Sequence, residues 1–135
     1  MDCVFCKIIA GQIPCHQVYE DDKVAAFLDI APITRGHTLI TPKRHYPDVA
    51  TTPAEVVDAL MRALQKIAPA VLRATGASAF NVGINNGAAA GQVVAHTHFH
   101  LIPRSANDGL EPWPHQQYGP GEGARLAQTI AAALA

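Results

Sequence analysis

The sequence predicts an α+β fold: a five-stranded antiparallel sheet arranged as a meander, with one long helix and shorter helices at the two ends. Five short segments have the β-branched, aromatic and aliphatic composition of strands. A single long stretch repeats its apolar residues at helical spacing. Strands and helices do not alternate, as a parallel sheet would require. With 135 residues, the chain suits one domain over 1–135 that buries a real core.

The first half of the chain supplies a short helix and three strands. Residues 3–11 favour a helix that ends at Gly11. Residues 15–20 and 23–29 favour strands joined by a polar turn, and therefore a hairpin. A loop with Pro32 and Gly36 as breakers precedes a third strand over 37–42.

The long helix is predicted to start at Thr52-Pro53-Ala54-Glu55, which has the pattern of a capping box with proline at the first helical position. The helix should run to about Ala74 and end at Gly76, and Pro69 should kink or divide it. Five apolar residues mark its buried face: Val56, Leu60, Leu64, Ile67 and Val71.

The second half supplies the last two strands and a tail. Residues 77–83 favour a fourth strand, with Phe80, Val82 and Ile84 on one face. The histidine-rich segment that follows is the fifth. After Arg104 the chain reads as a loop, and Leu126, Ile130 and Leu134 mark a short C-terminal helix.

Composition narrows the classes of partner. Ten basic and eleven acidic residues give a net charge of −1 without a run of either sign. This argues against a nucleic-acid surface and against a polybasic membrane patch. The sequence has no apolar run of membrane-spanning length and no signal peptide at its start. We therefore expect a cytoplasmic protein whose three cysteines are reduced. The two that lie close together, Cys3 and Cys6, are expected to be metal ligands or reactive thiols, and Cys15 has no predicted role.

Three of the seven histidines stand at alternate positions, His96, His98 and His100. In a strand they would share one face, while Phe99 and Leu101 would point into the core. Such a row is either a histidine-rich surface strand that binds metal incidentally or a catalytic edge. The preceding loop, residues 85–92, is made of small residues with glycines, so its backbone N–H groups can approach an anion. Together these features favour phosphoryl or nucleotidyl transfer.

Gly91-Gln92 followed by His96-x-His98-x-His100 resembles the signature of the histidine triad (HIT) family. The resemblance extends from about Cys3 to Arg104 and is strongest to the bacterial branch with an N-terminal Cys-x-x-Cys. It implies a nucleotide hydrolase or nucleotidyl transferase that cleaves at the α-phosphate of a nucleoside phosphoramidate or a dinucleoside polyphosphate. It also implies a covalent nucleotidyl-histidine intermediate and a homodimer.

The resemblance also assigns roles to single residues. His98 would be the nucleophile, and His100 would donate to phosphate oxygens together with Gln92 and the loop N–H groups. Asp29 would accept hydrogen bonds from the ribose, His37 would lie near the α-phosphate, and Asn85 would bind the sugar or phosphate. The remaining substrate-binding residues would line the base and sugar or shape the loop: Phe5, Ile8, Phe27, Leu28, Ile30 and Gly91. Without the resemblance, the apolar residues read equally well as core, His37 as a surface histidine and Asn85 as a turn residue.

Cys3 and Cys6 have the spacing of half a zinc site, although two buried, apolar-like cysteines would show the same pattern. The resemblance supplies the other two ligands, His45 and His96. Four protein ligands leave no open position, so the zinc would be structural.

Val93 departs from the family pattern, because many members carry Ser or Thr directly after Gly-Gln. Valine cannot donate a proton, which would favour phosphate-type leaving groups over amines. Two other classes of function stay open at this point. The protein could bind purine nucleotides as a sensor without turnover, or all three histidines could hold a catalytic metal.

Overall fold

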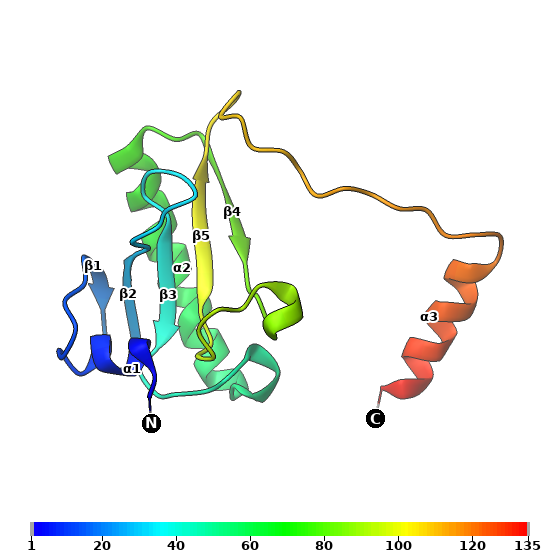
Figure 1. The fold of residues 1–135 in the computed structure, drawn as a ribbon, viewed down its shortest axis with the longest axis horizontal. Coiled ribbons are helices and arrows are strands. Elements are labelled where there is room, and N and C mark those ends of the chain that lie inside the picture. The colour runs from blue at the N-terminus through cyan, green and yellow to red at the C-terminus, as the bar shows by residue number, and fades with distance from the viewer. Residues whose placement is uncertain (1, 135) are drawn as a thin grey trace.

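The computed structural model describes residues 2–134 and contains a five-stranded antiparallel sheet in the order β1-β2-β3-β5-β4. Its five strands are β1 (Gln17–Glu20), β2 (Val24–Leu28), β3 (Thr38–Pro42), β4 (Ala79–Gly83) and β5 (Phe99–Arg104). The α+β fold and the antiparallel sheet are confirmed. The strand order departs from a simple meander once, because β5 inserts between β3 and β4 (Figure 1).

The helix α2 (Ala54–Thr75) lies across one face of the sheet and buries the main core there (Figure 1). Alternate strand residues point toward it, including Ile40 of β3 and both Phe99 and Leu101 of β5. The expectation that Phe99 and Leu101 enter the core is confirmed. The helix ends at Gly76, whose positive φ of 75° forms a left-handed cap.

The capping box predicted at the start of α2 does not form. No side chain caps the helix, and Pro53 is the residue before its first turn rather than within it. The hydroxyl of Thr52 is used elsewhere, because it donates to the Asp48 carbonyl oxygen at 2.6 Å and lies 2.8 Å from the hydroxyl of Thr97. Pro69 does not divide α2, which is one continuous helix of 22 residues.

The opposite face of the sheet carries the short helix α1 (Val4–Ile9) and a second, smaller core of Cys3, Phe5, Phe27 and Leu39. Because side chains alternate along a strand, His100 of β5 projects to this same face, away from α2. The functional side of the sheet is therefore the α1 side.

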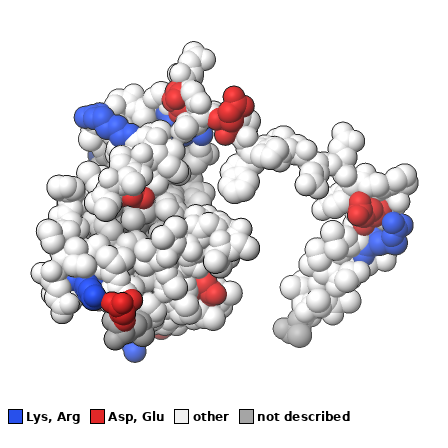
Figure 2. Space-filling view, viewed as in Figure 1, with Lys and Arg blue, Asp and Glu red and all other residues white. Residues whose placement is uncertain are grey.

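The C-terminal helix α3 (Glu122–Ala133) stands apart from the sheet at the end of an extended segment (Figure 1). None of its residues is buried, and Leu126 and Ile130 are exposed. Among the described residues, no helix is long and apolar enough to cross a membrane. Figure 2 shows positive and negative side chains scattered over the visible face without a patch of one sign.

Candidate active site and metal centre

The histidine row is arranged differently from the sequence prediction. β5 begins only at Phe99, so His96 and His98 lie in the bent segment before it. Thr97 donates its backbone N–H to the Tyr46 carbonyl oxygen at 2.7 Å, which holds this segment against a loop instead of a neighbouring strand. As a result the three imidazoles do not form one row. His96 turns toward the cysteines, while the rings of His98 and His100 stay 4.9 Å apart.

The hydrogen bonds of His98 define which of its nitrogens is free. Its Nδ1 lies 2.6 Å from the carbonyl oxygen of His96, and a carbonyl can only accept, so Nδ1 carries the proton. Nε2 then holds the lone pair. Burial lowers the pKa of His98 from its ordinary 6.5, which keeps the ring neutral at pH 7. A neutral imidazole with one fixed N–H and one free lone pair is suited to nucleophilic attack.

The same reasoning gives the opposite tautomer for His100. The backbone N–H of Ile33 donates to Nδ1 of His37 at 3.1 Å, so the proton of neutral His37 is on Nε2. That Nε2 lies 2.9 Å from Nδ1 of His100, which must accept, and the remaining proton of His100 is on its Nε2. Burial, followed by the nearby His98 and His37, lowers the pKa of His100 to about 4. The site therefore pairs a nucleophilic lone pair with a neutral N–H donor.

His37 is deeply placed, with 2 % of its surface exposed. Burial lowers its pKa, partly opposed by the carboxylate of Asp29, whose Oδ2 lies 3.7 Å from Nε2. Asp29, His37 and His100 could be read as a metal site from their proximity. The proton on Nε2 of His37 argues against that, because the nitrogen facing the other two groups is a donor. His37 instead links the loop 30–36 to His100.

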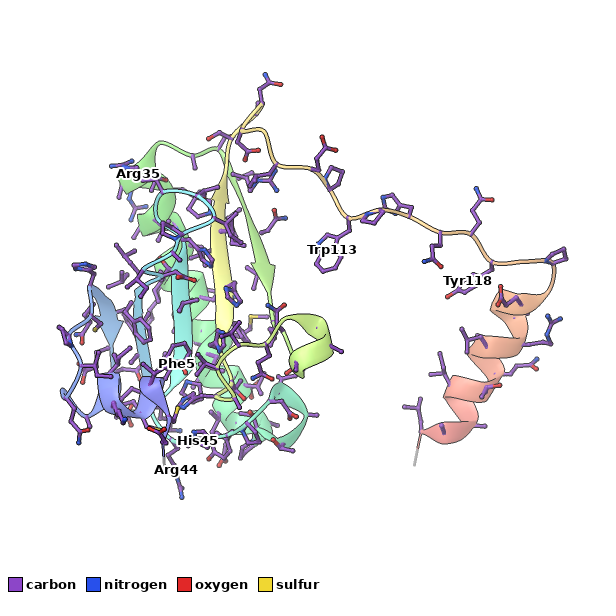
Figure 3. All side chains as sticks on the ribbon, in the orientation of Figure 1. Phe5, Arg35, Arg44, His45, Trp113 and Tyr118 are labelled. Atoms are coloured by element: carbon purple, nitrogen blue, oxygen red, sulfur yellow. The ribbon has the colours of Figure 1, made fainter. Side chains whose placement is uncertain are left out.

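A separate cluster brings together Cys3, Cys6, His45 and His96, the four residues predicted as metal ligands. Nδ1 of His96 lies 3.5 Å from Cys3 Sγ, 3.6 Å from Cys6 Sγ and 3.2 Å from Nδ1 of His45. Tetrahedral zinc with ordinary bond lengths requires sulfur–nitrogen separations of about 3.6 Å and nitrogen–nitrogen separations of about 3.4 Å. The donor set and its spacing fit zinc. Figure 3 labels His45 beside the first turn of α1, where this cluster lies.

The surroundings of the cluster also suit a metal. Nε2 of His96 lies 2.8 Å from the Pro42 carbonyl oxygen and donates to it, which orients Nδ1 toward the cysteines. Burial lowers the pKa of His96, so its ring is neutral, as a metal ligand must be. Burial raises the pKa of the Cys6 thiol, followed by the neighbouring Cys3. A bound cation would reverse that effect by stabilising the thiolates.

The loop 85–92 binds half of its backbone N–H groups internally, those of Gly87, Ala90, Gly91 and Gln92. The N–H groups of Gly91 and Gln92 donate to the carbonyl oxygens of Ala88 and Gly87 at 3.0 and 3.1 Å. The side-chain amide of Gln92 makes three further hydrogen bonds within the protein. Gly91 adopts a positive φ of 89°, which glycine permits, and this turn closes the loop. Among described residues, the Asn85 amide has no partner and borders a cavity of about 640 Å³ beside His100.

The residues predicted to hold the nucleoside divide into two groups. Phe5 and Phe27 are buried and in edge-to-face contact at 5.4 Å, and Phe5 also packs against the His98 ring at 4.9 Å. Ile8 packs against the same small core. Ile30, by contrast, is 90 % exposed, and Asp29 is partly exposed with Oδ1 bonded to the Ala31 N–H. The nucleoside contacts remain predictions.

Trp113 borders the site although no sequence pattern predicts a role for it. It comes from the extended segment after β5 and lines the cavity beside His100 (Figure 3). Arg104 holds the start of this segment in place. Its guanidinium donates to both carboxylate oxygens of Asp108, at 2.6 and 3.0 Å, and to the side-chain oxygen of Asn81 at 2.7 Å. The approach of this segment depends on tertiary structure, so no local pattern could have revealed it.

The fold and the site together define a class of small α+β proteins with paired neutral histidines beside a Cys/His cluster that could hold a metal ion. The chain belongs to the HIT family, since the HIT domain model matches residues 10–107. It is 52 % identical over 109 residues to the adenylylsulfatase HINT3 of Arabidopsis thaliana, covering 81 % of this chain and 55 % of that protein. It is 40 % identical to the adenosine 5′-monophosphoramidase hnt1 of Schizosaccharomyces pombe, covering 91 % and 83 % of the two chains.

Two solved structures complete the comparison. A HIT family protein from Bacillus subtilis superposes with a TM-score of 0.91 at 41 % identity, over 100 % of this chain and 99 % of that one. A zinc-bound histidine triad protein from Mycobacterium smegmatis gives a TM-score of 0.79 at 40 % identity, over 98 % of each chain. Both structures cover nearly the whole chain, and they share the α+β fold described above.

Proposed function

We propose that the protein hydrolyses a nucleotide conjugate at its α-phosphate through a covalent nucleotidyl intermediate on His98. The observation that carries this proposal is the complementary protonation of two adjacent histidines. His98 offers a free lone pair on Nε2, and His100 offers an N–H on Nε2. Attack on phosphorus requires the lone pair, and the N–H stabilises the charge that develops on the phosphate oxygens.

In the first step, Nε2 of His98 forms a bond to the α-phosphorus while the bond to the leaving group breaks. The proton stays on Nδ1, which donates it in a hydrogen bond to the His96 carbonyl oxygen, and this acceptor stabilises the positive charge that develops on the ring. In the second step, water attacks phosphorus, the phosphorus–nitrogen bond breaks, and His98 returns to its neutral form. The nucleoside monophosphate is released, and the proton that the attacking water loses passes to the solvent.

Asn85 and His100 are the side-chain donors available to the phosphate oxygens, because both border the cavity and Gln92 is already committed. Asp29 remains the proposed partner of the ribose, and Phe27 and Ile30 the proposed neighbours of the base. His37 contributes indirectly by holding His100 in its donor tautomer. The Cys3, Cys6, His45 and His96 cluster would hold a structural zinc ion, which would tie the N-terminus to the segment that carries His98.

Val93 is 94 % exposed directly after Gly91-Gln92 and has no group that can protonate a leaving group. We therefore propose a preference for leaving groups that depart as stable anions, such as sulfate or phosphate, over amines. The resemblance to a protein named adenylylsulfatase supports this, and the one named a phosphoramidase points to the competing substrate.

The test measures turnover of adenylyl sulfate, a dinucleoside polyphosphate and an adenosine phosphoramidate by the wild type and by His98→Ala and Val93→Ser. The proposal expects the anionic leaving groups to react faster in the wild type, with Val93→Ser gaining on the phosphoramidate alone. A wild type that prefers the phosphoramidate would contradict the leaving-group proposal. Full turnover by His98→Ala would contradict the mechanism.

A homodimer, carried from the family resemblance, is also proposed. Phe80 and Val82 of the edge strand β4 are exposed, as are Leu126 and Ile130 of α3. These apolar surfaces support a second copy as their partner. Light scattering coupled to size exclusion tests this, and a monomer at micromolar concentration would contradict it.

A further inference from the structure

The side-chain amide of Gln92 joins the loop 85–92 to a different part of the chain. Its Oε1 accepts the Gly87 N–H at 2.8 Å, and its Nε2 donates to the carbonyl oxygens of Pro47 at 2.7 Å and Val94 at 3.1 Å. Both protons of the amide are therefore used within the protein. Gln92 is a brace between two loops and has no donor left for a substrate.

The other side of this brace is the segment 46–49, which directly follows His45 of the Cys/His cluster. The Val49 N–H donates to the side chain of Asn86 at 2.8 Å, which makes a second link to the same loop. The Tyr46 carbonyl oxygen accepts both the N–H and the hydroxyl of Thr97, at 2.7 and 3.2 Å. One short segment thus connects a cluster ligand, the loop 85–92 and the residue between His96 and His98.

We propose that Gln92 is a positioning residue that couples the Cys/His cluster to the loop 85–92, so that a metal ion in the cluster and a nucleotide phosphate at the loop strengthen each other's binding. This rests on the proposed function in one respect, since it takes a nucleoside monophosphate as the ligand beside the loop.

The physical cause is the cost of ordering the segment 46–49. A metal ion bound by the cluster would hold His45 against His96, and the Pro47 carbonyl oxygen would stay where Gln92 donates to it. If the metal were removed, the partly buried side chains of Cys6 and His45 would lose that common partner, and the segment 46–49 would be freer to move. Nucleotide binding must then supply the ordering itself. Linkage requires the effect to be equal in both directions.

The experiment uses the full chain, zinc-loaded and chelator-treated, with adenosine 5′-monophosphate as the probe in titration calorimetry. We expect the wild type to bind the probe about 10-fold more tightly when loaded. Gln92→Met should abolish this ratio. Gln92→Glu should do the same, because it keeps an acceptor for Gly87 and loses both donors. Gln128→Met, the same change on the exposed helix α3, should keep the wild-type ratio.

A second readout does not require the stripped protein to stay folded. The rate at which a chelator removes zinc is measured with and without the probe. The probe should slow removal about 10-fold in the wild type and leave the rate in Gln92→Met unchanged. Equal slowing in both proteins, or none in the wild type although the probe binds, would overturn the coupling. Failure of the zinc-loaded wild type to bind the probe would overturn the proposed function as well. This outcome differs from a loss of the coupling alone, in which the probe still binds.

Discussion

Lowering the pH from 7 to 5 should destabilise the folded protein, and replacing His100 should remove a defined part of that loss. The folded protein holds His100 neutral, with its pKa lowered to about 4, chiefly by burial and then by His98 and His37. In the unfolded chain the pKa returns to about 6.5. Between these values the unfolded state binds a proton that the folded state does not, so stability falls as the pH falls through this window.

The size of the effect follows from the two pKa values. His100 contributes about 3 kcal/mol that is present above pH 6.5 and lost below pH 4, of which about 2 kcal/mol is lost between pH 7 and pH 5. His37, His96 and His98 act in the same direction, because burial lowers the pKa of each. Metal binding by the Cys/His cluster would also weaken in acid, because its ligands must be deprotonated.

The measurement is urea unfolding at pH 7 and pH 5 for the wild type, His100→Gln and His16→Gln. The wild type should lose about 2 kcal/mol more than His100→Gln between the two pH values. The comparison cancels contributions shared by both proteins, including that of the metal. His16 is exposed before β1, and its variant should follow the wild type. Equal losses in the wild type and His100→Gln would refute the assignment of His100 as a buried neutral donor.

Three further predictions address the core, the metal and the site. Leu60→Ala, at a fully buried position under the sheet, should lower the free energy of unfolding by about 2–5 kcal/mol, and a loss below 1 kcal/mol in urea titrations would be inconsistent with this core. Cys6→Ser should lose bound zinc, measured by atomic absorption, whereas Cys15→Ser, outside the cluster, should retain it; equal zinc content would disprove the ligand set. His37→Phe should lower kcat about 10–100-fold with little change in nucleotide affinity, since it removes the donor that fixes His100 together with the acceptor of the Ile33 N–H, and unchanged kcat would contradict that role.

Much of the fold could be predicted because its signals are local. The alternation of Phe99 and Leu101 with polar neighbours marks a half-buried strand, and Gly76 marks the end of α2 through its left-handed conformation. Thr52 misled the prediction because its hydroxyl could cap a helix or bond to distant groups. In the folded protein the Thr52 hydroxyl bonds to the hydroxyl of Thr97, far along the chain, and does not cap the helix.

The site shows a similar division. Alternate histidines mark a special segment, but the bend that turns His96 away from His98 depends on Tyr46, which no local pattern connects to it. The spacing of Cys3 and Cys6 gives half a metal site, and only the family resemblance supplied His45. The family resemblance assigns Gln92 to the substrate, and the structure adds that both of its amide protons are donated within the protein, to Pro47 and Val94. Such hydrogen bonds join distant segments of the chain, so only the three-dimensional structure reveals them.

His98 is proposed to be the nucleophile, with its Nε2 bonded to phosphorus in a covalent nucleotidyl intermediate. The most direct test is intact-mass spectrometry of the wild type and His98→Ala, mixed with adenylyl sulfate and quenched at neutral pH within the first turnovers. The account predicts a mass increase of one adenylyl group on the wild type and none on His98→Ala, together with loss of turnover in the variant. Equal turnover in both proteins, with no adduct on the wild type, would contradict it.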